Sequence, residues 1–140
     1  MKIALDTLRL AVVVMVCAVS VIALKNNGYF DPVPYRGVEL VNAEFQDDGR
    51  LLVHARYIKT PADCEYVRGQ VFVNVLGARE AVPFEPIRAE GQGAQRFVGE
   101  QALRWLIDLG GLTVSSVEIW TRHNCGGTIV DRQMLAVQIH

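Results

Sequence analysis

The chain has 140 residues, 51% of them hydrophobic, and a formal net charge of −1 at pH 7. This length predicts a single domain that is large enough to bury a core of its own. The charge is nearly balanced and no run of basic residues stands out. The sequence therefore lacks the basic surface by which a nucleic-acid-binding protein contacts phosphates.

An apolar run near the N-terminus accounts for much of the hydrophobic content. Residues 10–24 read LAVVVMVCAVSVIAL and include no charged residue. As a helix they rise about 22 Å, less than the hydrocarbon core of about 30 Å, so residues 3–5 and Leu8 would have to extend a span. Lys2 and Arg9 precede the run, which predicts that the N-terminus stays in the cytoplasm and that the rest is translocated.

We therefore expect residues 1–25 to form a signal anchor, a single-pass helix of the inner (plasma) membrane that contacts the lipid bilayer through residues 10–24. The C-terminal domain is then expected on the periplasmic, extracytoplasmic side. Two alternatives stay open: a signal peptide cleaved at Ala18 or Ala23, where small residues fit a cleavage site, and a helix buried inside a soluble protein. A lipoprotein signal at Cys17 is disfavoured, because the residues before it lack the required pattern.

The hydrophobic period changes after this helix. Pro32 and Pro34 fix φ and disfavour a helix, so residues 26–37 are expected to form an extended spacer. From residue 38 apolar residues recur at every second position, which is typical of strands, and from 67 to 75 valine or glycine fills every second place. A short helix at residues 100–106 is an alternative to one of these strands.

Turn-forming residues separate these segments at intervals of about ten residues, which is the pattern of a β-sandwich. We therefore predict an all-β domain over residues 38–140, an Ig-like antiparallel β-sandwich of about six or seven strands. The expected strands are residues 38–45, 50–59, 65–76, 82–84, 96–109, 116–124 and 128–139.

Three cysteines are present, and two of them lie in the β domain. Cys64 precedes an expected strand and Cys125 follows another, so in an oxidising compartment they are expected to form a disulfide bond. The bond would close a loop of about 60 residues and stabilise the fold by about 4 kcal/mol in the chain-entropy estimate. Alternatives are free thiols and a zinc site at which Asp63 and His123 join both cysteines. Cys17 lies in the apolar helix and acts there as a small apolar residue.

The sequence shows no assembled catalytic set, and no metal or cofactor is expected. His123 could act as a base toward Cys125, but a bridged cysteine has no thiolate to offer. Trp105 and Trp120 are expected to pack in the core or between sheets, with exposure at an interface as the alternative. A candidate binding rim around the disulfide end consists of Trp120, Arg122, His123 and Arg132.

Three segments of the β domain carry a resemblance to known proteins. They read Cys64-Glu65-Tyr66-Val67-Arg68, Arg122-His123-Asn124-Cys125-x-Gly127 and Val130-Asp131-Arg132. They resemble small membrane-anchored proteins of bacterial viruses and marine bacteria, and the similarity covers most of the chain after Tyr35. The resemblance implies a disulfide-bearing β-sandwich in an envelope or host-surface setting, without assigned activity, and it transfers no catalytic residue.

These observations favour a non-enzymatic, membrane-tethered interaction domain whose partner is another envelope protein or a second copy of the chain. One alternative is an accessory structural subunit of a larger membrane complex, in which the apolar helix packs on other helices. The other alternative is a metal-binding or thiol-dependent enzyme that uses Cys64, His123 and Cys125.

Overall fold

The computed structural model describes the backbone of residues 2–26, 32–88 and 98–139, and the side chains of residues 9–25, 32–88 and 98–139. These residues fall into two compact units, Met1–Asp31 and Pro32–His140. Residues 27–31 of the expected spacer and residues 96 and 97 of one expected strand lie outside the described residues.

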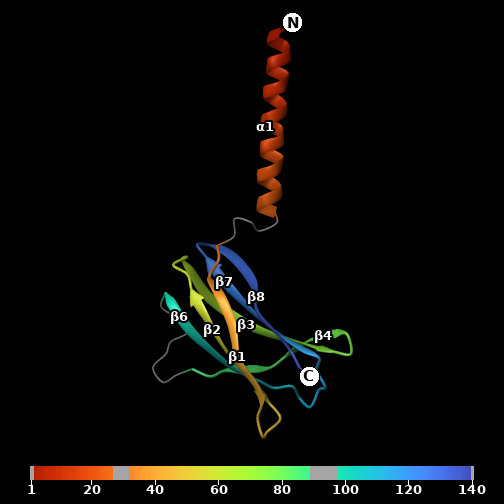
Figure 1. Ribbon diagram of the computed structural model, residues 1–140, viewed down its shortest axis with the longest axis vertical. Coiled ribbons are helices and arrows are strands. Elements are labelled where there is room, and N and C mark those ends of the chain that lie inside the picture. The colour runs from red at the N-terminus through yellow and green to blue at the C-terminus, as the bar shows by residue number, and fades with distance from the viewer. Residues whose placement is uncertain (1, 27–31, 89–97, 140) are drawn as a thin grey trace. The chain divides into compact units, whose positions relative to one another are not determined.

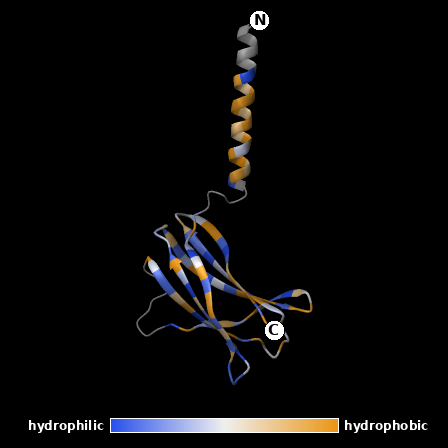
Figure 2. Ribbon diagram, in the orientation of Figure 1, coloured by the Kyte–Doolittle hydropathy of each residue, from blue (hydrophilic) through white to orange (hydrophobic). Residues whose placement is uncertain are grey.

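The first unit contains one helix, α1, which spans Lys2–Asn26. Apolar residues make up most of its described length, as the orange colour along the helix ribbon shows (Figure 2). The large ones are exposed: Leu10, Val12, Val13, Val14, Met15, Val16, Val19, Val21, Ile22 and Leu24. The hydroxyl of Ser20 donates a 2.8 Å hydrogen bond to the carbonyl oxygen of Val16, so the helix itself satisfies this polar group.

The transmembrane signal anchor expected at residues 1–25 is not supported. Within the part of the chain whose side chains are described, no helix is long and apolar enough to cross a membrane. The physical reason is length, because the apolar run of residues 10–24 rises only about 22 Å. The residues expected to extend it, 3–5 and Leu8, have side chains outside the described part.

The second unit contains two four-stranded antiparallel sheets (Figure 1). One sheet has the strand order β1-β2-β6-β5 and the other has the order β4-β3-β7-β8. The strands are β1 (Tyr35–Phe45), β2 (Leu51–Lys59), β3 (Cys64–Val75), β4 (Ala78–Val82), β5 (Phe84–Pro86), β6 (Gly99–Ile107), β7 (Ser116–Cys125) and β8 (Thr128–Gln138). This arrangement confirms the predicted β class, and two antiparallel sheets are consistent with a β-sandwich.

The core lies where alternate side chains of the two sheets meet. In β7 every second residue from Val117 to Cys125 is buried, and the residues between them are only half-buried. The most deeply buried aliphatic side chains come from both sheets: Leu51, Val53 and Ile107 from one, and Val71, Val73, Val117 and Ile119 from the other. The alternating β-branched residues of the sequence therefore produce this packing, because they fit a pleated, half-buried surface.

A β-bulge in β3 interrupts the alternation that the sequence suggested. Tyr66 pairs with His123 and Arg68 pairs with Arg122, so Val67 is an extra residue between the two pairs. Val67 is 50% exposed, so it does not share the buried face of Val71 and Val73, although the alternation from 67 to 75 places it in register with them. Because the bulge absorbs one residue, Tyr66 instead faces inward beside His123.

Three further segments differ from the sequence prediction. β1 begins at Tyr35, which is buried, so the last part of the expected spacer is strand instead. Residues 100–106 belong to β6 and not to a helix, because Trp105 and its alternate neighbours are buried as in a strand. The sequence did not predict β4, which pairs with β3 through a turn at Leu76 and Gly77. Both turn residues have positive φ (51° and 86°), as a type I′ hairpin turn requires.

Candidate functional site

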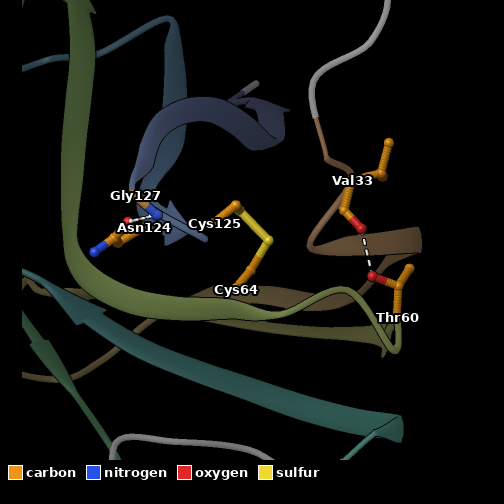
Figure 3. Close-up of a disulfide and its surroundings, with 6 residues drawn as sticks. All are labelled: Val33, Thr60, Cys64, Asn124, Cys125 and Gly127. Atoms are coloured by element: carbon orange, nitrogen blue, oxygen red, sulfur yellow. Dashed lines mark hydrogen bonds between the residues drawn. A yellow bond between two sulfur atoms is a disulfide. The ribbon is translucent and has the colours of Figure 1, made fainter.

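Cys64 and Cys125 form the expected disulfide bond, and they do so within one sheet (Figure 3). They lie directly opposite each other at the ends of β3 and β7, with 4.0 Å between their Cα atoms, and both are buried. Their sulfur atoms are bonded to each other, so neither offers a thiolate to a metal or a substrate. Among the described residues, no group of three or more His, Cys, Asp and Glu side chains could hold a metal ion.

Turns and hydrogen bonds fix the backbone around this bond (Figure 3). Asn124 Oδ1 accepts a 2.9 Å hydrogen bond from the backbone N–H of Gly127 in the turn that follows β7. Just after the end of β2, the hydroxyl of Thr60 donates to the carbonyl oxygen of Val33, which lies just before β1. Hydrogen bonds therefore hold the backbone beside the ends of strands from both sheets.

A pocket of about 80 Å³ opens between the two sheets at this end. It is larger than the space that one water molecule needs, and smaller than a typical drug-sized site. Side chains from both sheets line it: Pro34, Tyr35, Tyr57, Lys59, Cys64, Tyr66, Pro86, Arg88, Leu103, Trp105, Thr121, His123 and Met134.

Aromatic rings form much of the pocket wall. The ring centroid of Tyr35 lies 5.6 Å from that of His123 and 5.9 Å from that of Tyr57. Tyr66 meets the same imidazole edge-on, at 5.9 Å between centroids. The buried hydroxyl of Tyr35 is 2.9 Å from Thr121 Oγ1, which is hydrogen-bonding distance. Ring packing and this buried hydrogen bond together hold the wall in place.

Trp105 lines the pocket next to Gly69 and is buried, as expected for a core tryptophan. Its ring stacks on Phe84 with 4.4 Å between centroids. A Cβ atom on Gly69 would come within 2.5 Å of Trp105 Cη2 and within 2.9 Å of the Tyr66 hydroxyl oxygen. Glycine is therefore required at this position because the tryptophan ring occupies the space of a side chain.

His123 is a buried titratable group among these rings. Burial, with a smaller contribution from the nearby charge of Lys59, lowers the pKa of its imidazole to about 4, so it is neutral at pH 7. Its Nε2 atom is buried and has no hydrogen-bond partner among the described residues. Burial also raises the pKa of the Tyr35 and Tyr66 hydroxyls, so both keep their protons. A buried nitrogen without a partner is unusual in a folded protein.

The four residues of the expected rim lie on two different faces of their sheet. His123 faces the pocket, and Arg132, which pairs with buried Thr121, has a buried Nε that lacks a partner within the described residues. Trp120 and Arg122 point to the opposite face, because neighbouring residues of a strand alternate. The structure therefore brings two of the four to the inner face and leaves the other two outside.

The outer face of this sheet carries its own polar contacts. Arg122 forms a bidentate ion pair with Asp131, with both N–O distances at 2.6 Å. Trp120 Nε1 donates a 2.9 Å hydrogen bond to Glu118, which also accepts a 2.8 Å hydrogen bond from Arg79. Trp120 is therefore half-buried on the outer face and not in the core, where it was expected.

The sequence pattern did not single out the tyrosines of the pocket. One signal was available, because Tyr57 and Lys59 are two residues apart in β2 and so share a face. Tyr66 likewise shares a face with Cys64, but simple alternation from the later valines of β3 places both on the outside. The bulge at Val67 corrects this, and nothing in the local sequence reveals it.

No protein-family model matches the chain, and no curated protein or solved structure is found to be similar to it. Its function is therefore inferred from its own residues and geometry.

Proposed function

We propose that this chain is a non-enzymatic interaction domain of the cell envelope. An Ig-like β-sandwich on the extracytoplasmic side is attached to a lipid bilayer through residues 10–24, and it binds another envelope protein or a second copy of itself. The observation that carries the proposal is the surface of α1, where large aliphatic side chains are exposed from Leu10 to Leu24. Such a surface is stable only in apolar surroundings, which lipid supplies.

Two details of the first unit support attachment to lipid. The Ser20 hydroxyl is hydrogen-bonded to the carbonyl oxygen of Val16, so it enters an apolar phase with its donor satisfied. Lys2 and Arg9 precede the apolar run, so their charges lie outside the segment that is proposed to contact lipid.

The order of the strands supports the Ig-like assignment. In immunoglobulin-type sandwiches, strands A, B, E and D form one sheet, and C, F and G form the other. If β1 to β8 are named A, B, C, C′, D, E, F and G, the two sheets read A-B-E-D and C′-C-F-G. The disulfide differs from the immunoglobulin one, because it joins C to F within a sheet instead of B to F between sheets.

The disulfide also supports an extracytoplasmic location. Disulfides form and persist in oxidising compartments and are rare in the cytosol. Because the Cys64–Cys125 pair is buried at the end of the core, it is a structural bond and not an exposed, exchangeable one.

Flotation of the full-length chain with phosphatidylcholine vesicles tests the attachment. The native chain is expected to float with the vesicles. Val13→Asp places a charge in the apolar run and is expected to weaken flotation strongly. Val67→Asp is a matched control, because Val67 is similarly exposed but lies on the sandwich, and this variant should float like the native chain. A native chain that stays at the bottom of the gradient contradicts the proposal.

The location and the interaction need separate tests. In spheroplasts, a protease added outside is expected to degrade the β domain, and protection from it would contradict an extracytoplasmic location. Cross-linking in intact cells is expected to yield a defined larger species. Recovery of monomer alone under several cross-linking conditions would count against an interaction domain.

A further inference from the structure

The strand β1 ends its sheet, because it is the first strand in the order β1-β2-β6-β5 and β2 lies on one side of it. The middle of this strand is open to solvent. Glu39, Leu40, Val41 and Asn42 are all exposed, and the two apolar side chains among them are 43% and 44% exposed. An exposed strand edge of this kind is a template on which a strand of another chain can pair.

The outer face of β1 carries charges of opposite sign near its two ends. Tyr35 is buried between the sheets, so Arg36, the next residue, points to the outer face. Glu44 pairs with Leu52, whose two neighbours in β2 are buried, so Glu44 points outward as well. Asn42 Nδ2 donates a 3.0 Å hydrogen bond to Glu44 Oε2 on this face. Both charged side chains are exposed and available to a partner.

Arg36 and Glu44 are placed symmetrically about Leu40. Each is four residues from Leu40 in the sequence, and their partners in β2 are each three residues from Ala55, the partner of Leu40. The counts differ because β1 has one bulge on each side of Leu40, and each bulge adds one residue. The two bulges therefore preserve the symmetry of the strand.

This symmetry makes β1 complementary to a second copy of itself. In an antiparallel pair related by a two-fold axis at Leu40, Arg36 of each copy lies opposite Glu44 of the other, on the same outer face. Glu39 lies opposite Asn42, whose amide can donate to its carboxylate. Leu40 lies opposite its own counterpart. Each charged residue of β1 then faces an opposite charge or an amide, and like charges do not meet.

The other strands that end the sheets offer no equivalent pairing. β8 is as long as β1, but of its two charged residues Asp131 is already held in an ion pair with Arg122. Arg132 pairs with buried Thr121 and faces inward. β4 and β5 have only five and three residues. Charge and length therefore favour β1.

We propose that two copies of this chain associate through β1, antiparallel about Leu40, so that their β1-β2-β6-β5 sheets join into one continuous sheet. The inference rests on the proposed interaction function and identifies the partner as a second copy. It is independent of attachment to lipid, because β1 lies wholly within Pro32–His140. One strand pair is a small interface, so we expect a dissociation constant in the micromolar range.

Sedimentation equilibrium of the full-length chain in density-matched detergent micelles tests the proposal. The native chain is expected to show a monomer–dimer equilibrium. Arg36→Glu and Glu44→Arg each place two pairs of like charges across the interface, so each variant alone should associate at least about tenfold more weakly. A native chain that stays monomeric throughout the micromolar range overturns the proposal. Variants that associate as tightly as the native chain also overturn it, because pairing through α1 or another surface would give that result.

An equimolar mixture of these two variants tests the register. In the mixed dimer the two substituted positions face each other with opposite charges, and the native Arg36 of one copy faces the native Glu44 of the other. The mixture should therefore associate within about threefold of the native affinity. Recovery also shows that both variants are folded, which circular dichroism checks independently. A mixture that associates as weakly as the separate variants overturns the pairing about Leu40.

Arg104→Glu is the matched control for a general effect of charge. Arg104 is exposed on the outer face of the same sheet, but it lies in β6, and β2 separates it from β1. This reversal should leave the association within about twofold at about 0.15 M salt. A loss equal to that of Arg36→Glu overturns the proposal.

Failure of this pairing is distinguishable from failure of the proposed function. A native chain that is monomeric in micelles, floats with vesicles and forms a larger species when cross-linked in cells overturns self-association through β1. The same result leaves the proposed function in place, with another envelope protein as the partner.

Discussion

The ring of Trp105 and the backbone of Gly69 are so close that no side chain fits between them. A Cβ atom on Gly69 would stand 2.5 Å from Trp105 Cη2 and 3.0 Å from Phe84 Cζ. Since Gly69 and Trp105 lie in different sheets, this contact sets how closely the two sheets approach beside the pocket.

Gly69→Ala is expected to destabilise the β domain by about 1–3 kcal/mol, because an added methyl group overpacks a filled space. Thermal unfolding measured by circular dichroism gives the loss. Trp105→Leu removes the atom that causes the clash, so the double variant should lose less than the sum of the two single losses. Strictly additive losses would contradict the steric explanation.

Replacing both Cys64 and Cys125 by alanine is expected to lower the free energy of unfolding by about 3–4 kcal/mol, because the unfolded chain gains freedom without the bond. Urea unfolding of oxidised protein measures the difference. Cys17→Ala is the control, since Cys17 is a free cysteine in α1, and it should leave the unfolding of the sandwich unchanged. An equally stable double alanine variant would show that the bond contributes nothing.

Tyr35→Phe is expected to cost about 1–2 kcal/mol, because it leaves the buried hydroxyl of Thr121 without its partner. Thr121→Val removes the other partner and should cost a similar amount. The double variant leaves neither hydroxyl buried, so it should be more stable than the two single losses predict. Urea unfolding of the native protein, the two single variants and the double variant gives the coupling energy between the two hydroxyls. A coupling energy of zero would refute the hydrogen bond.

Acid is expected to destabilise the fold through His123. The pKa of its imidazole is about 4 in the folded state, against 6.5 for an unperturbed histidine. Between these pH values the unfolded chain binds the proton more readily, so stability falls as the pH drops from about 6.5 to about 4, then levels off. The full shift corresponds to about 3 kcal/mol, which solvent in the open pocket reduces to about 1–2 kcal/mol.

Urea unfolding at pH 7 and at pH 4.5 measures this loss. His123→Phe should remove most of the difference between the two pH values, because phenylalanine fills the site and does not titrate. Asp131→Asn is the control. Arg122 lowers the pKa of the Asp131 carboxyl, so the stability that this carboxylate contributes is lost below the pH range of the measurement. The same pH dependence in His123→Phe as in the native chain would assign it to other groups.

The strands could be predicted because their side chains alternate within a single segment. Val117 and Ile119 are two residues apart and both are buried in β7, as the sequence indicates. The role of Tyr35 could not be predicted in this way. It follows a proline pair that is typical of a spacer, and its burial depends on Thr121, a residue 86 positions away.

The candidate site could be predicted only in part. Two cysteines beside strands were enough to indicate the disulfide. The pocket depends on the distance between two sheets, which the contact of Gly69 with Trp105 sets, and on the bulge at Val67. Both arise from pairing between distant strands, so no local pattern contains them.

The position of Cys125 has a consequence for the order of folding. It ends the seventh of the eight described strands, 61 residues after Cys64, so the bond needs β3 and β7 to find each other first. Such distant pairing forms slowly compared with local hairpins. With only these two cysteines in Pro32–His140, no rearrangement among bonding isomers is required. Oxidation therefore stabilises a sheet whose two central strands have already paired.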